Sequence, residues 1–308
     1  MDTFLGPFEE AVLHPVYGAI RSGLENTLCR DAGPSSPSGL SRTTLQGFCS
    51  PIQHSSFWQP DNSIRRLTNA FLYLWLSTTV SYLVLGAVLY RLNFDAAAAA
   101  RDPKFRPGQV RGEISRSLVA ITVMSLLTAP IVLAQAAGRA RIYPLGAAPA
   151  WYEALQVVLF VAFNDTCVYW LHRLFHTPVL FRLMHKKHHQ YMTPTPFSAF
   201  AFDPLEAMIM SLPIYAFSFV VPMSDAMQLL AFLAAYLWTF LLHDDSTQFH
   251  TVHHKNTNFN FGQYTTLWDR WGGTYVDADE FLSQPQYRKE KRSPRPAAAS
   301  SADQYGSL

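Results

Sequence analysis

Residues 151–176 read WYEALQVVLFVAFNDTCVYWLHRLFH, an apolar run that leads directly into two histidines. The run up to residue 171 matches the roughly 20 residues that an α-helix needs to cross about 30 Å of hydrocarbon. His172 and His176 are four positions apart, so on a continuing helix both imidazoles share a face and can reach one metal ion. The stretch therefore predicts a membrane-spanning helix that carries metal ligands to one face of the membrane.

Other apolar runs extend this prediction along the chain. Residues 67–92 and 118–137 are as long as the first run, whereas 205–221 and 227–242 are shorter and flank a turn-like Val-Pro-Met-Ser-Asp segment. The shorter pair predicts a hairpin that leaves one membrane face and returns to it. With 49% hydrophobic and 15% charged residues, the chain is predicted to be an all-α integral membrane protein, a bundle of about four transmembrane helices.

The remaining composition excludes some functions and sets the expected boundaries. A net charge of +2 is too small for a nucleic-acid-binding protein, and three cysteines without a CxxC pair do not support a thiolate metal site. We expect a polar N-terminal lead over residues 1–65, mostly loop, and a membrane-embedded domain over 66–281. Residues 282–308 are charged and rich in proline, which predicts a disordered tail.

Basic residues set the expected orientation in the membrane. They concentrate between the first two spans, at Arg91, Arg101, Lys104, Arg106, Arg111 and Arg116, and the positive-inside rule places this segment in the cytosol. Counting spans onward predicts that the histidines form a cytosolic cap. The N-terminal lead would then be lumenal, where Cys29 and Cys49 could pair.

Histidine is the unusual residue of this chain. Nine of its eleven histidines lie between positions 172 and 254, whereas His14 and His54 stand alone and are expected to be ordinary interfacial residues. Nine imidazoles exceed the needs of one metal ion and predict a site for two. The predicted ligands are His172, His176, His185, His188, His189, His243, His250, His253 and His254.

Two carboxylates are candidates for supporting roles at this site. Asp165 lies two helical turns before His172, and a ligating histidine needs a partner for its second ring nitrogen, so Asp165 is predicted to orient His172. Asp203, which precedes Pro204, is either a metal ligand or the N-cap of the next helix.

The histidine motifs resemble a known family. The series HRLFH, HKKHH and HTVHH is similar to the HxxxH, HxxHH, HxxHH series of the fatty acid hydroxylase superfamily. The segments Pro-Thr-Pro-Phe at 194–197 and FGQYTTLWDRWGG at 261–273 narrow the resemblance to its sterol C-5 desaturases. The resemblance implies a cytosolic di-iron site in the endoplasmic reticulum membrane that uses O2, with electrons from NAD(P)H through cytochrome b5 and its reductase. It also implies that a C5–C6 double bond is introduced into a sterol or a related polycyclic terpenoid.

The sequence also departs from that subfamily's pattern. Phe200 and Asp203 stand where Ser-His-Ala-Phe-His-Pro is usual, and Phe249 stands where a further histidine often precedes the last motif. These departures leave two alternatives open. One is a hydroxylase acting on a fatty acyl, sphingoid or specialised terpenoid substrate, and the other is a non-catalytic pseudo-enzyme.

Overall fold

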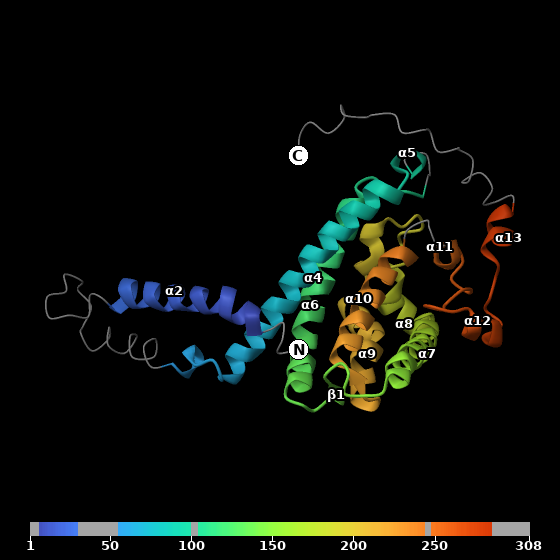
Figure 1. Cartoon of the computed structure of the whole chain (residues 1–308). Coiled ribbons are helices and arrows are strands. Elements are labelled where there is room, and N and C mark those ends of the chain that lie inside the picture. The colour runs from blue at the N-terminus through green and yellow to red at the C-terminus, as the bar shows by residue number, and fades with distance from the viewer. Residues whose placement is uncertain (1–5, 30–54, 100–103, 244–247, 285–308) are drawn as a thin grey trace.

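The computed structural model describes residues 6–29, 55–99, 104–243 and 248–284 (Figure 1). Its elements are, in chain order, η1 Glu9–Leu13, α2 His14–Leu24, η2 Glu25–Cys29, η4 Ser56–Trp58, α4 Ser63–Asn93, α5 Ala96–Ala99, α6 Gln109–Ala136, β1 Ile142–Tyr143, α7 Ala150–Phe175, α8 Pro178–Leu183, η5 His185–Lys187, η6 Pro196–Phe200, α9 Pro204–Val220, β2 Met223–Ser224, α10 Asp225–Leu242, α11 Gln248–Lys255, α12 Leu267–Gly272 and α13 Ala278–Ser283.

Four of these helices are long and apolar enough to cross a membrane, namely α4, α6, α7 and α10. The predicted all-α membrane fold with about four spans is therefore confirmed. Helices α4 and α6 run in opposite directions, whereas α7 and α10 both end at the same face, and the shorter apolar helix α9 returns between them and forms a hairpin with α10 (Figure 1). At the turn of this hairpin β2 pairs in parallel with β1, which fixes the hairpin to the connection between α6 and α7.

Helix α6 starts nine residues before the apolar run that predicted it. Its first turns carry polar side chains that are buried rather than solvated: Gln109 donates to Glu113 Oε1 and to the Thr193 carbonyl, each at 2.8 Å. Ser117 donates to the Phe197 carbonyl at 3.1 Å. The helix can begin there because the chain at residues 193–197 satisfies these groups internally.

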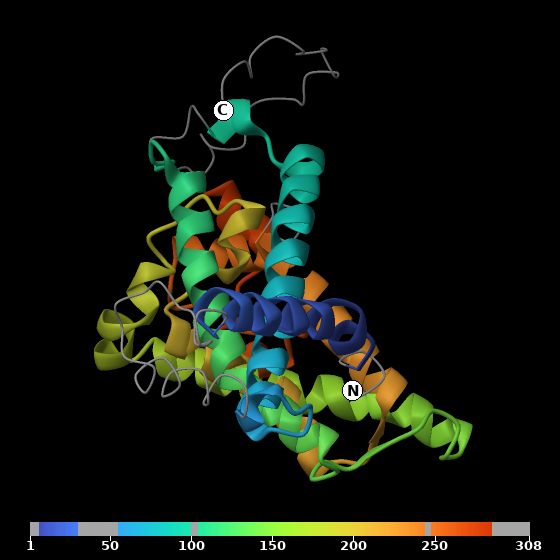
Figure 2. The same cartoon turned by 90° about the vertical axis from the view of Figure 1, so that its left-hand side faces the viewer.

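The expectation of a mostly looped N-terminal lead is wrong for residues 9–29, which are helical. Apolar residues recur there at helical spacing, as at Leu13, Val16 and Ile20, a pattern of an amphipathic helix. In Figure 2, α2 lies across α4. Buried Arg65 of α4 joins the two, since its guanidinium lies 4.7 Å from the centre of the Tyr17 ring and 3.3 Å from His14 Nδ1.

Three sequence predictions fall on chain that the structure does not describe. Cys49, the expected partner of Cys29, and His54 lie outside the described residues, as does the tail from residue 285 onward. The segment 244–247 between His243 and the last histidine motif also lies outside them.

Candidate metal centre

The nine predicted ligands meet at one end of the bundle. His172 is in the last turn of α7, His176 caps that helix, and His243 caps α10. The HKKHH motif lies on and just after η5, and the HTVHH motif lies on α11. Helical spans thus bring together residues that are up to 82 positions apart in sequence, between 172 and 254.

The imidazoles divide into two groups, and within each the candidate ligand atoms lie within 4.8 Å of one another. The first group contains His172, His176, His185, His189 and His253. The second contains His188, His243, His250 and His254. Two adjacent groups of four or five nitrogen donors suit a pair of transition-metal ions.

Hydrogen bonds made by Nδ1, the ring nitrogen that points away from the centre of the cluster, leave Nε2 free to bind a metal ion. His172 Nδ1 donates to the Phe261 carbonyl at 3.0 Å, His253 Nδ1 to Phe259 at 2.7 Å, and His243 Nδ1 to Thr239 at 2.7 Å. A carbonyl only accepts, so Nδ1 carries the proton in each ring and Nε2 presents a lone pair. These three rings are therefore held in the tautomer that a metal ion requires.

The inner nitrogens then face one another. His189 Nε2 lies 2.9 Å from His185 Nε2 and 3.2 Å from His253 Nε2, and His243 Nε2 lies 3.4 Å from His188 Nε2. Other buried ring nitrogens, including both of His250 and both of His254, have no hydrogen-bond partner among the described residues. Such a collection of orphaned nitrogens is costly to bury unless a cation lies between them. The residues present therefore fit a two-metal site.

Burial keeps these rings neutral. Desolvation lowers the pKa of His185, His188, His189 and His250 well below the usual histidine value, and nearby imidazoles lower it further. The same causes act on the pKa of His253 and His254, and for His176 burial lowers the pKa to about 2. Only neutral imidazole binds a metal ion, so the site is ready for one at physiological pH.

Glu206 is a member of this site that the sequence analysis missed. It lies in the first turn of α9, is fully buried, and accepts a short hydrogen bond from His185 Nδ1. Like the carbonyls above, it leaves His185 Nε2 unprotonated and directed at the other rings. The sequence did contain a sign of this role: Glu206 is an acidic residue at the start of an apolar run, where an ionisable group needs a partner.

Asp165 does not contact His172 as predicted. Its carboxylate accepts from the Tyr264 amide at 2.7 Å and from the Thr265 amide at 3.2 Å, and also from the Thr265 hydroxyl. It holds the loop that follows Phe261, whose carbonyl is the partner of His172. The predicted hydrogen bond is thus replaced by a longer connection, because α7 presents Asp165 to this loop rather than to the imidazole.

Asp203 is the N-cap of α9, one of the two predicted alternatives. Its Oδ1 accepts from the Leu205 amide at 3.2 Å, and Lys187 donates to its Oδ2 at 3.1 Å. Neither described ligand group includes it. The other unusual positions are also accounted for: Phe200 packs against Tyr236 and Phe240, and Phe249 offers its carbonyl to Asn260 at 3.2 Å.

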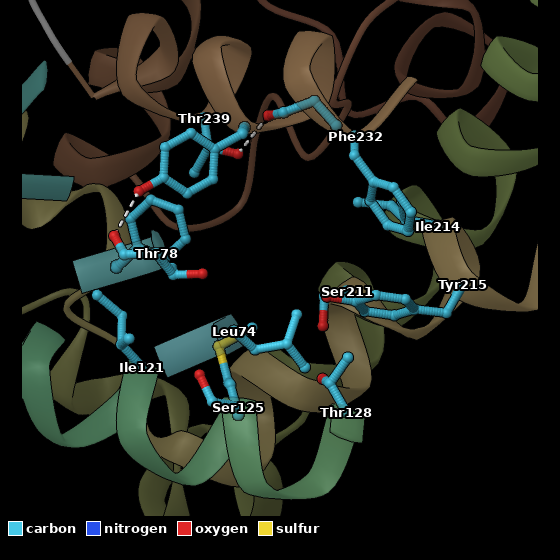
Figure 3. A pocket seen from close by; sticks show the side chains of 14 residues that line it. Leu74, Thr78, Ile121, Ser125, Thr128, Ser211, Ile214, Tyr215, Phe232 and Thr239 are labelled. Atoms are coloured by element: carbon cyan, nitrogen blue, oxygen red, sulfur yellow. Dashed lines mark hydrogen bonds between the residues drawn. The ribbon is translucent and has the colours of Figure 1, made fainter. Parts of the chain in front are cut away.

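Two cavities lead from the membrane-embedded part of the bundle to the histidines. The inner one is lined by His172, His185, His188, His243 and His250 at one end and mostly by apolar residues of α7, α9 and α10 elsewhere. The outer one lies between α4, α6, α9 and α10, and Leu74, Ile121, Ile214 and Phe232 surround it (Figure 3).

The cavities adjoin and share part of their walls. The shared lining residues are Met124, Phe200, Ser211, Ile214, Ala235 and Thr239. Because the cavities adjoin, one long and mostly apolar small molecule can extend from the outer cavity to the metal-binding end of the inner cavity.

Comparison with known proteins agrees with this site. The sequence model of the fatty acid hydroxylase family matches residues 157–274. Delta(7)-sterol 5(6)-desaturase erg3A of Aspergillus fumigatus is 34% identical over 255 residues, covering 79% of this chain and 71% of the relative. The Leptosphaeria maculans Delta(7)-sterol 5(6)-desaturase is 34% identical over 245 residues, covering 76% and 68%.

A second Aspergillus fumigatus protein, erg3B, is 35% identical over 243 residues, covering 75% of this chain and 72% of the relative. Among solved structures there is no match. The matched family region, residues 157–274, contains all nine clustered histidines together with Asp165, Glu206 and the loop at Phe261. The motifs, the four spans and the sequence identity agree, and the chain belongs to the fatty acid hydroxylase family, with sterol desaturases as its relatives.

Proposed function

We propose that this protein is a di-iron oxidoreductase that introduces the C5–C6 double bond into a Δ7-sterol or a closely related polycyclic terpenoid. The observation that carries the proposal is the pair of histidine groups at the end of an apolar cavity. Relatives that are 34–35% identical over most of the chain have the printed name Delta(7)-sterol 5(6)-desaturase.

The nine clustered histidines are the residues that would hold the two iron ions. When bound, iron supplies the one-electron chemistry that allows O2 to attack an unactivated C–H bond. The chain contributes the rest: backbone carbonyls and Glu206 fix the ring tautomers, and the buried cavity excludes water from the reacting carbon atoms. Removal of two hydrogens from the sterol and two electrons from NAD(P)H balance the reduction of O2 to two waters.

The electron donor and the location are part of the same proposal. The family resemblance supports delivery of electrons from NAD(P)H through cytochrome b5 and its reductase, in the endoplasmic reticulum membrane. The basic segment that joins α4 and α6 supports a cytosolic position for the metal site, because the histidines lie at the same end of the bundle (Figure 1).

The sterol profile of a yeast strain that lacks its own C-5 desaturase tests the proposal directly. Expression of this protein should produce 5,7-diene sterols, whereas His188→Ala and His253→Ala variants should produce none because a ligand is lost. An unchanged sterol profile in the presence of folded, iron-loaded protein would show that the C5–C6 assignment is wrong.

A further inference from the structure

One polar atom inside the spans has no role in the site described so far. Asn164 lies in the middle of α7 and is fully buried. Its amide nitrogen donates to the Phe160 carbonyl at 3.1 Å, which fixes the orientation of the amide, while Oδ1 has no partner among the described residues. Leaving such an acceptor unsatisfied in an apolar interior destabilises the protein unless a ligand supplies the donor.

Asn164 lines the inner cavity together with Val168 and His172. These three residues are four positions apart and form one stripe of α7, so the amide lies about 12 Å along the helix axis from His172. Of the unpartnered buried side-chain atoms among the described residues, Asn164 Oδ1 is the only one outside the histidines that belongs to a residue lining either cavity.

Two polar residues on the wall shared by both cavities, Ser211 and Thr239, differ from it. Ser211 donates its hydroxyl to the Met208 carbonyl at 3.0 Å, and Thr239 donates to the Ala235 carbonyl at 2.9 Å. Both satisfy themselves on their own helices, as hydroxyls in membrane helices commonly do. They need no donor from a ligand, whereas Asn164 does.

We infer that Asn164 Oδ1 accepts a hydrogen bond from the 3-hydroxyl group of the substrate and thereby sets which carbon atoms face the metal site. The inference rests on the proposed function. Because Oδ1 can only accept, the ligand group must be a donor, and a sterol carries one hydroxyl on an otherwise apolar skeleton. Carbon 3 is two bonds from carbon 5, so anchoring this hydroxyl on α7 fixes the position of the C5–C6 bond, which approaches His172 when the ring system points along α7 toward the histidines.

The ring system then lies in the inner cavity, between Asn164 and the histidines at its end. Asn164 is thus a positioning and specificity residue rather than a catalytic one.

The experiment compares a Δ7-sterol with its 3-deoxy analogue in the purified, iron-loaded full-length protein, with its electron-transfer partners supplied. Wild-type protein should prefer the hydroxylated substrate by roughly 10- to 100-fold in kcat/KM. Asn164→Leu, of similar size but without an acceptor, should lose most of this preference. Thr166→Val, which changes a hydroxyl to a methyl elsewhere on α7, should retain it.

The preference is a ratio within each protein, so a purely structural effect of Asn164→Leu on folding or iron content does not change it. Equal kcat/KM values for both substrates in the wild type would overturn the inference without requiring any variant. A preference that survives in Asn164→Leu would also overturn it. If neither substrate is desaturated by iron-loaded wild-type protein, the proposed function itself fails, which is a distinct result.

Discussion

At the scale of single residues, the metal site depends on the groups behind the imidazoles as much as on the imidazoles. The nine predicted ligands could be found because their spacing repeats in the sequence, and the structure brings all nine histidines together. Their partners were less predictable. Three are backbone carbonyls, which carry no sequence signal, and the acidic partner of His185 is 21 residues away on another helix.

Replacing Glu206 with glutamine should weaken iron binding by about 10- to 100-fold, because a neutral amide raises the basicity of His185 less than a carboxylate does and can also turn its NH2 group toward Nδ1. Iron retained during titration with a chelator measures the effect. Glu280→Gln on the exposed helix α13 is the control and should match the wild type. Wild-type iron retention in Glu206→Gln would show that the contact with His185 does not matter for the metal.

The lowered pKa values of the histidines predict how the iron-free protein responds to acid. In the unfolded chain each histidine takes up a proton near pH 6.5, whereas the folded chain does so only at much lower pH. The unfolded state therefore binds more protons below about pH 6.5, and the free energy of unfolding falls as the pH is lowered through that value.

Thermal unfolding of the iron-free protein in detergent between pH 8 and pH 5 checks this expectation. The melting temperature should fall steadily below about pH 6.5, because the many lowered histidine pKa values outweigh the carboxyl of Glu206, whose pKa burial raises to about 8. Iron loading should reduce the slope, since bound imidazoles cannot take up protons. A melting temperature that rises on acidification would contradict the assignment of neutral, buried rings.

At the scale of secondary structure, hydrophobic runs predicted the spans well and their ends poorly. The run that predicted α6 omits nine helical residues because their polar side chains are satisfied by a distant segment. Hydropathy measures transfer into lipid and does not record such partners. The same limitation applies to η6, whose first two residues belong to the Pro-Thr-Pro-Phe motif. The family resemblance identified this motif, but the sequence did not show that it packs against α4 and α6.

The contact between α4 and η6 depends on Gly86. A methyl group added there would lie 2.7 Å from the ring of Phe197, which is itself packed against Tyr82 and Tyr90. We expect Gly86→Ala to lower the free energy of unfolding by about 1–3 kcal/mol, because the ring has little room to move. Thermal unfolding of the full-length protein in detergent measures the difference.

Gly18→Ala is the matched control. Gly18 is also inside a helix, α2, but an added methyl group there meets nothing within 4 Å. Its replacement should be neutral or slightly stabilising, because alanine favours a helix over glycine. Equal effects of the two substitutions would show that the close approach of α4 to Phe197 does not limit stability.

At the scale of the whole molecule, the ends of the bundle differ in chemistry. The basic connection after α4 and the histidine motifs lie at one end, and the loop between β1 and α7 lies at the other (Figure 1). A membrane-impermeant maleimide applied to sealed microsomes should label Lys104→Cys and Asn258→Cys in a cysteine-free background. Leu145→Cys should react only after the membrane is opened. The reverse pattern would place the metal site in the lumen.

The sequence predicted the architecture and the clustering of nine histidines, yet not the route by which a substrate reaches them. The cavities are formed where residues from α4, α6, α7, α9 and α10 approach one another. No local pattern records such an approach, because each of these residues is an ordinary member of an apolar helix. Phe200 illustrates the point: it departs from the subfamily's pattern in sequence and serves in the structure as a wall between two cavities.

Each of the two histidine groups draws on distant parts of the chain. The first joins His172, His176, His185 and His189 to His253, and the second joins His188 to His243, His250 and His254. A metal ion in either group would therefore act as a cross-link that closes a loop of more than fifty residues, and such a link restrains the unfolded chain as a disulfide does. The supply of iron in the cell would then govern the lifetime of this protein as well as its activity.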